Sequence, residues 1–141
     1  MKKINRNVLL GVLSAGLFAL ATNPVTVHAS QSRRIGAWID SGLGVVSSVN
    51  GWLNDREEET KEYWLQRDVR YAFTATCDND CTDIDLKLFN RRGELQVEDT
   101  DPDDIPQIVF TPPASGTYRL SVVMFRCTIE PCRYDVNQYR R

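Results

Sequence analysis

The feature that most constrains the fold is an alternation of apolar and polar residues that recurs in short runs from Val69 to Val136. Between residues 83 and 88, for example, aspartate or lysine alternates with isoleucine or leucine. A side-chain period of two is that of a β-strand with one buried face. Turn signals separate the runs, namely Arg92-Gly93, Pro112-Pro113 and Ser115-Gly116. The pattern predicts a small antiparallel β-sandwich over residues 63–139, built from about six or seven short strands.

Two close pairs of cysteines lie within this region, Cys77 with Cys81 and Cys127 with Cys132. A domain of roughly 75 residues has a small core and usually needs covalent support. The favoured pairing is local, Cys77–Cys81 and Cys127–Cys132, which stabilises by only about 2 kcal/mol per bridge but fixes the shapes of two loops. A crossed pairing between the loops is the alternative. A four-thiolate zinc site is disfavoured because the spacings are loose.

Residues 1–29 have the pattern of a secretory signal peptide. A positive start is followed by the apolar run Val8–Ala21, which is shorter than the roughly 20 residues that span a bilayer. Small residues at the −3 and −1 positions predict cleavage after Ala29, with Ala21 as a second candidate and an uncleaved anchor as the alternative. We therefore expect a secreted or periplasmic protein that keeps no stable membrane span after cleavage.

The charges and residue types left after cleavage argue against nucleic-acid binding and against most kinds of catalysis. Removing residues 1–29 takes away three of 17 basic residues and none of 19 acidic ones, which leaves a net charge of −5. No basic stripe is present, so no nucleic-acid partner is expected. The only histidine, His28, is lost with the signal peptide, which removes histidine-based catalysis. We expect a protein that is not an enzyme; a small hydrolase using paired carboxylates is the least favoured alternative.

The segment from Asp78 to Asp104 is strongly acidic, with ten acidic residues against three basic ones. Crowded carboxylates suit calcium, which takes six to eight oxygen ligands. Asp83 and Asp85 project from one side of a strand, and a loop carrying Asp99 and Asp101 could fold over the same end. These four aspartates are the predicted ligands of a calcium site, although the spacing is not that of an EF-hand. The alternative is a solvated acidic loop whose side chains make turn hydrogen bonds.

Residues 30–62 are predicted to be a helical and charged segment that precedes the sandwich. Apolar residues between Ile35 and Leu53 recur with a helical period, although four glycines make this a poor helix. The run Asp55–Glu62 is expected to be a solvated connector or a short capped helix. The helix over 35–53 would either pack on the sandwich or present an amphipathic face that docks a partner.

Two stretches carry a resemblance to a known family. Residues 77–89, CDNDCTDIDLKLF, followed by Arg92-Gly93, resemble the strand–turn core of bacterial pre-peptidase C-terminal (PPC) domains. Residues 115–122, SGTYRLSV, are similar to a glycine–tyrosine strand of the same family. The resemblance covers residues 63–136 and implies an exported, jelly-roll-like and usually non-catalytic module that in some relatives binds calcium or an extracellular polymer.

Two departures from the family pattern shape the functional expectation. No peptidase domain accompanies the module in this sequence, and the two cysteine-bracketed loops are not part of the general PPC pattern. We therefore expect a stand-alone accessory module of the bacterial envelope or medium, whose partner is an extracellular protein or polysaccharide. Aromatic residues could serve such binding, but Trp64 and Tyr134 are expected to fill the core or a sheet face. Phe125 and Met124 must face opposite sides of one strand.

Overall fold

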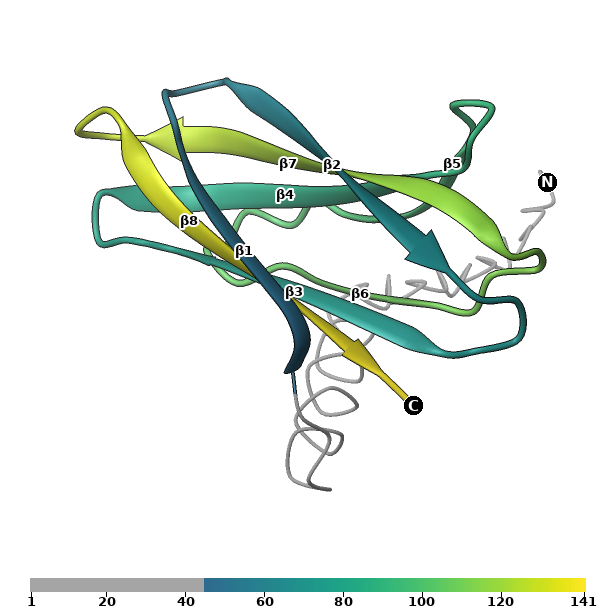
Figure 1. Ribbon diagram of the computed structural model, residues 1–141. Helices are drawn as coiled ribbons and strands as arrows, with labels where there is room; N and C mark the ends of the chain where they lie inside the picture. Colours follow the sequence, from purple (N-terminus) through teal and green to yellow (C-terminus); the bar gives the residue numbers. More distant parts are fainter. Residues whose placement is uncertain (1–44) are drawn as a thin grey trace, which may run out of the picture.

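The computed structural model describes residues 45–141, which form two four-stranded antiparallel sheets packed face to face (Figure 1). The eight strands of this described part are β1 (Val45–Leu53), β2 (Glu58–Leu65), β3 (Tyr71–Cys77), β4 (Cys81–Phe89), β5 (Leu95–Asp99), β6 (Gln107–Phe110), β7 (Gly116–Cys127) and β8 (Cys132–Arg140). One sheet has the order β1-β8-β3-β6 and the other β2-β7-β4-β5. This interleaved order is that of an eight-stranded jelly roll. The predicted all-β, jelly-roll-like sandwich is therefore confirmed.

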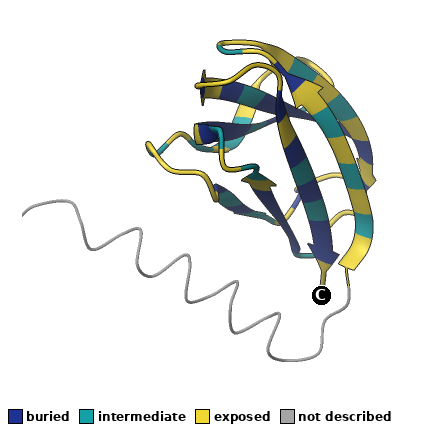
Figure 2. Cartoon of the chain, turned by 90° about the vertical axis from the view of Figure 1, so that its left-hand side faces the viewer, coloured by how far each residue is buried: buried dark blue, intermediate teal, exposed yellow. Residues whose placement is uncertain are grey.

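The alternation seen in the sequence is the alternation between the core and the outer faces. Ile84, Leu86 and Leu88 of β4 are fully buried, and they face Phe73 and Tyr134 of the other sheet across one core. Figure 2 shows buried and exposed residues alternating along the strands. Residues 45–141 contain no helix long and apolar enough to cross a membrane. The predicted signal peptide and residues 30–44 lie outside the described residues.

The helix predicted over residues 35–53 is wrong for its second half, because residues 45–53 form β1. This strand pairs with β8 from Val45 to Leu53. A β-carbon on Gly51 would lie 2.6 Å from the Tyr134 hydroxyl oxygen, so the packing of the Tyr134 ring over this position requires glycine. The glycine that weakened the helix is thus one that the strand needs. Long-range pairing overrides the local helical period, and the amphipathic helical face is not formed over this half.

The connector or short helix predicted over Asp55–Glu62 is also replaced by a strand from Glu58 onward. β2 runs from Glu58 to Leu65 and pairs with β7 along its whole length. Glu59 and Lys61 point inward at the edge of the sandwich, where they form an ion pair, and the Tyr134 hydroxyl donates a hydrogen bond to Glu59. Inward charges on an edge strand hinder pairing with other chains. Two strands of the sandwich thus lie within the segment predicted to precede it.

Both cysteine pairs form local disulfides, Cys77–Cys81 and Cys127–Cys132, the pairing that the sequence favoured. Cys81 and Cys127 are register partners on β4 and β7, so the two bridges lie at the same end of the sandwich. We call this the disulfide end and define it by segments 54–57, 78–80 and 128–131. At the opposite end lie segments 66–70, 90–94 and 111–115, which with Trp64 form the arginine–tryptophan end (Figure 1).

Candidate functional site

Two of the four predicted calcium ligands lie together in a hollow on the outer face of the sheet β2-β7-β4-β5. Asp83 and Asp85 of β4 line this hollow, whose volume is about 360 Å³. The remaining lining residues are Lys87, Glu98, Thr100, Pro102 and Phe125. The loop after β5 is tied to this strand because the Ile84 N–H donates to the Asp103 carbonyl at 3.0 Å. We call this the acidic hollow.

The other two predicted ligands do not line the hollow. The Asp99 carboxylate accepts hydrogen bonds from the backbone N–H groups of Gln107, at 2.8 Å, and Asp101, at 3.4 Å. It therefore organises the loop between β5 and β6, as in the turn alternative. Within residues 45–141 no group of three or more His, Cys, Asp or Glu side chains is arranged to hold a metal ion. The four aspartates do not converge on one point, and calcium binding stays a prediction.

Burial shifts the acid–base properties of both aspartates in the hollow. Asp85 is only 6% exposed, and this burial, with the nearby charge of Asp83, raises the pKa of its carboxyl to about 6. Burial likewise raises the pKa of Asp83, partly opposed by the charge of Arg126. One carboxylate oxygen of Asp83 is buried without a hydrogen-bond partner among the described residues. The hollow therefore holds carboxylates whose charges the fold leaves poorly compensated.

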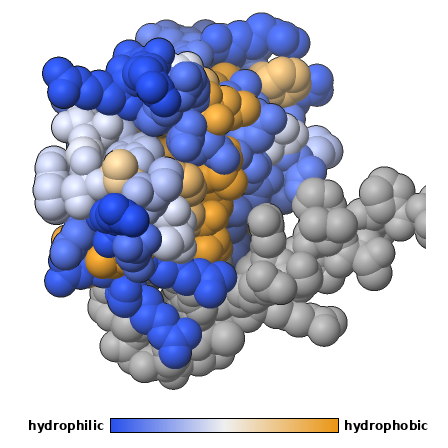
Figure 3. Space-filling model, turned by 90° about the vertical axis from the view of Figure 1, so that its right-hand side faces the viewer, coloured by the Kyte–Doolittle hydropathy of each residue, from blue (hydrophilic) through white to orange (hydrophobic). Residues whose placement is uncertain are grey.

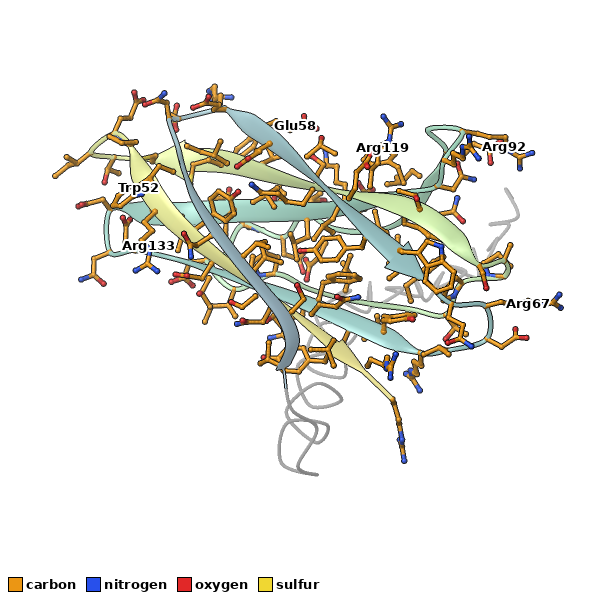
Figure 4. The ribbon with its side chains drawn as sticks, in the orientation of Figure 1. Trp52, Glu58, Arg67, Arg92, Arg119 and Arg133 are labelled. Carbon is orange, nitrogen blue, oxygen red and sulfur yellow. A yellow bond between two sulfur atoms is a disulfide. The ribbon has the colours of Figure 1, made fainter. Side chains whose placement is uncertain are left out.

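The two ends of the sandwich carry opposite charge. The three segments of the disulfide end hold five acidic residues and one arginine, a net charge of −4. Those of the arginine–tryptophan end hold four arginines and two acidic residues, a net charge of +2. The arginines are Arg67, Arg70, Arg91 and Arg92. Figure 4 shows Arg67, Arg92 and Arg119 toward one end and Trp52 and Arg133 toward the other.

The turn that carries Arg91 and Arg92 is held by its own hydrogen bonds. The Asn90 side-chain oxygen accepts from the backbone N–H groups of Arg92, at 2.9 Å, and Glu94, at 3.0 Å. Gly93 adopts a φ of 82°, a conformation that glycine takes without strain. The Asn90 amide also donates to the Glu94 carboxylate at 2.6 Å, and this bond with the nearby Arg92 charge lowers the pKa of Glu94. The turn is therefore pre-shaped before any partner arrives.

The neighbouring loop, residues 111–115, is tied to both sheets. The Arg67 N–H donates to the Ser115 hydroxyl at 2.8 Å, and the Asp68 N–H donates to the Pro112 carbonyl at 3.0 Å. The Tyr118 hydroxyl donates to the Ala114 carbonyl at 3.1 Å. These bonds connect the loop between β6 and β7 to the turn between β2 and β3. The whole end is thus a rigid surface held by hydrogen bonds.

A second hollow, of about 440 Å³, lies at this end between the turn and the loop. Its lining includes Trp64, Arg91, Arg92, Ser115 and Thr117. Trp64 points out from β2 and is 65% exposed, whereas Tyr134 is fully buried in the core. Among residues 45–141, neither Arg91 nor Arg119 forms an ion pair. Figure 3, which faces this end, shows hydrophobic surface between hydrophilic patches.

The arginines of this site were missed by the sequence interpretation. The sequence pattern places Arg67 and Arg92-Gly93 in turns and counts Arg91 and Arg92 only as charges that oppose the acidic segment, so it predicts a binding role for none of them. A signal was present, because these arginines lie in turns after β2 and β4, strands that run in the same direction along the sandwich. Sequence separation hid the cluster, since only the jelly-roll order brings these turns to one end.

Comparison with known proteins supports the fold but identifies no protein family for this chain. No protein-family model matches this chain, and no curated protein matches it. Among solved structures, the chain is similar to PliG of Aeromonas hydrophila, a periplasmic inhibitor of g-type lysozyme. The two share 13% sequence identity with a TM-score of 0.51, over 72% of this chain and 90% of PliG. The likeness shows a shared sandwich fold.

Proposed function

We propose that this protein is an exported, non-catalytic binding module whose arginine–tryptophan end binds a protein partner. The observation that carries the proposal is a hollow lined by the exposed Trp64 and by Arg91, which forms no ion pair among the described residues. Tryptophan and arginine are the residue types that most often dominate protein–protein binding energy. A surface held by hydrogen bonds loses little conformational entropy on binding.

Export and lack of catalysis rest on separate observations. The predicted signal peptide and two disulfides are typical of proteins that fold in an oxidising compartment. Residues 45–141 contain no histidine, and all four cysteines are paired, so neither a histidine base nor a thiolate nucleophile is on hand there. Binding rather than chemistry is the role that this set of side chains supports best.

We further propose that the partner is a glycan-cleaving enzyme of the lysozyme type. The structural neighbour PliG supports this proposal by its described role as a lysozyme inhibitor. Most glycoside hydrolases hold two carboxylates in a cleft, and a guanidinium group complements a carboxylate in charge and hydrogen-bond geometry. Arg91, at a projecting turn and without an ion pair in the described residues, has the chemistry to enter such a cleft.

The test compares matched substitutions at the two ends. We would measure inhibition of a g-type lysozyme and the Kd by calorimetry for the W64A, R91A and W52A variants. W64A and R91A should each weaken binding at least about tenfold, or about 1.4 kcal/mol. W52A is the control because Trp52 is 60% exposed at the other end, and it should leave the Kd unchanged.

Two outcomes would count against this proposal. An equal loss of affinity in the W52A and W64A variants would show that the lysozyme does not bind specifically at the arginine–tryptophan end. Absence of any binding to the lysozyme would overturn the lysozyme assignment and leave the partner class open.

The PPC resemblance also stays a proposal. It is supported by the jelly-roll strand order, which spans the two stretches that carry the resemblance. A wider set of homologous sequences that joins this chain to PPC domains through intermediates would test it.

A further inference from the structure

The acidic hollow holds a buried carboxylate that the fold leaves without a partner. Asp85 is 6% exposed and lines the hollow, and its side chain forms no hydrogen bond or ion pair within 4.0 Å among the described residues. One oxygen of Asp83 beside it is also buried and without a hydrogen bond. Burying an unpaired carboxylate is costly, so the folded protein gains from a cation placed there.

The hollow is surrounded by more negatively charged groups than positively charged ones. Asp83, Asp85 and Glu98 line it with Lys87. The charges of Asp99, Asp103 and Arg126 act on the two aspartates from nearby, so five carboxylates stand against two cations. Among residues 45–141 Lys87 forms no ion pair within 4.0 Å with any of them. The existing lysine therefore does not neutralise the hollow, and room for at least one further positive group remains.

The walls of the hollow favour an organic cation over a metal ion. Phe125, which is 42% exposed, and Pro102 supply apolar surface that a bare ion would not use. The guanidinium of Arg56 already lies over one face of the Phe125 ring, 5.3 Å from its centroid, which shows that the ring suits a guanidinium group and leaves only its remaining surface for a ligand. A volume of about 360 Å³ suits a side-chain-sized group, and the carboxylates do not converge as metal ligands.

We propose that the acidic hollow binds an organic cation, an alkyl guanidinium or alkyl ammonium group, with Asp85 as its charge partner and Phe125 as its aromatic wall. The group could belong to a small amine or to an arginine or lysine side chain of another protein. The site is distinct from the arginine–tryptophan end, so this proposal does not depend on the proposed function.

The test titrates agmatine, cadaverine, the peptide acetyl-Gly-Arg-Gly-amide and calcium chloride separately into the oxidised protein at constant ionic strength. Amide NMR shifts of residues 83–87 and 98–101 report occupancy of the hollow. Agmatine should bind saturably, and D85N should weaken it at least tenfold. D104N is the matched control, because it removes the same charge from an exposed position in the neighbouring loop, and it should change the Kd less than twofold.

A second variant keeps the proposal falsifiable if D85N alters the fold. F125L preserves an apolar wall and removes the aromatic ring, and it should weaken agmatine binding several-fold.

Binding of the amines without the peptide would identify a small-molecule ligand, and binding of the peptide would identify a partner side chain; either supports the proposal. Equal weakening of agmatine binding by D85N and D104N would show that the amine is held only by diffuse attraction to negative charge. Calcium binding that depends on Asp85, without amine binding, would make the hollow a metal site. Either of these last two results overturns the proposal.

Discussion

The two ends of the sandwich are shaped by different kinds of bond. At the disulfide end, two covalent bridges fix segments 78–80 and 128–131, and the Thr128 N–H adds a hydrogen bond to the Asp80 carbonyl at 2.8 Å. At the arginine–tryptophan end no disulfide is present among the described residues, and the turns are held by hydrogen bonds, packing and the ion pairs Arg67–Asp68 and Arg92–Glu94. The net charges of the two ends also have opposite signs.

This difference separates stability from recognition. Disulfides stabilise the fold whatever the partner, whereas exposed arginines and a tryptophan contribute little until a partner covers them. The disulfide end does expose Trp52 and Ile129, so an apolar surface alone does not distinguish the ends. What distinguishes the arginine–tryptophan end is the combination of a hollow, an exposed tryptophan and Arg91, which has no ion pair in the described residues.

The largest expected effect comes from opening the disulfide end. Replacing Cys127 and Cys132 together by alanine should lower the free energy of unfolding by about 2 kcal/mol, because the unfolded chain regains the entropy of a short closed loop. Urea unfolding followed by tryptophan fluorescence measures this change.

The matched control for the disulfide variant is R91A, R92A at the other end, which should change stability by less than about 0.5 kcal/mol. If this control lost as much unfolding free energy as the cysteine variant, the two ends would not differ in their contribution to stability.

A smaller effect is expected from the hydrogen bond that links β2 to β8 two residues beyond Cys132. The pKa of Glu59 is lowered by its hydrogen bonds from Lys61 and Tyr134, so the folded state favours the charged form. Its contribution is present above the unfolded pKa of about 4.3 and is lost as the pH falls through the lower folded pKa. E59Q should therefore cost about 1 kcal/mol at pH 7.

The pH series for E59Q is the check on this assignment. The difference in unfolding free energy between E59Q and the unmodified protein should shrink toward acid pH. The glutamate at position 62, on the outer side of the same strand, supplies the control E62Q. A difference for E59Q that stays constant with pH would mean that its charge has no role.

The smallest change in stability with a specific consequence is expected at the turn of residues 90–94. N90A removes the acceptor for two exposed backbone N–H groups, which water can partly replace, and should cost about 0.5 kcal/mol. Because the turn positions Arg91 and Arg92, partner binding should weaken as well, while the disulfide end keeps its amide NMR shifts.

N90D gives the sharper version of that experiment. It keeps the acceptor for the two backbone N–H groups, but it replaces the amide that donates to Glu94 by a second carboxylate and adds a negative charge beside the arginines. Partial recovery of stability without recovery of binding is expected. If N90A bound the partner normally, the shape of this turn would not matter for recognition.

Much of the fold followed from local pattern, and much of the site did not. The alternation from Val69 onward predicted the sandwich, and the close spacing of the cysteines indicated the observed local pairing. The same reasoning failed at β1 and β2, where a helical spacing of apolar residues and a run of glutamates hid two strands. Their strand character depends on pairing with β8 and β7, which are more than 50 residues away in the chain.

The sequence by itself determined that apolar and polar residues alternate along the chain, that a core this small needs covalent support, and that no histidine follows residue 28. These properties are local or compositional, so no knowledge of distant contacts is needed to see them. The tertiary structure alone decided that Asp85 is buried while Asp99 organises a loop, and that Trp64 of β2 shares a hollow with Arg91 and Arg92 of the turn after β4. The reason is physical: burial, pKa and charge clustering depend on which segments the jelly-roll order brings together.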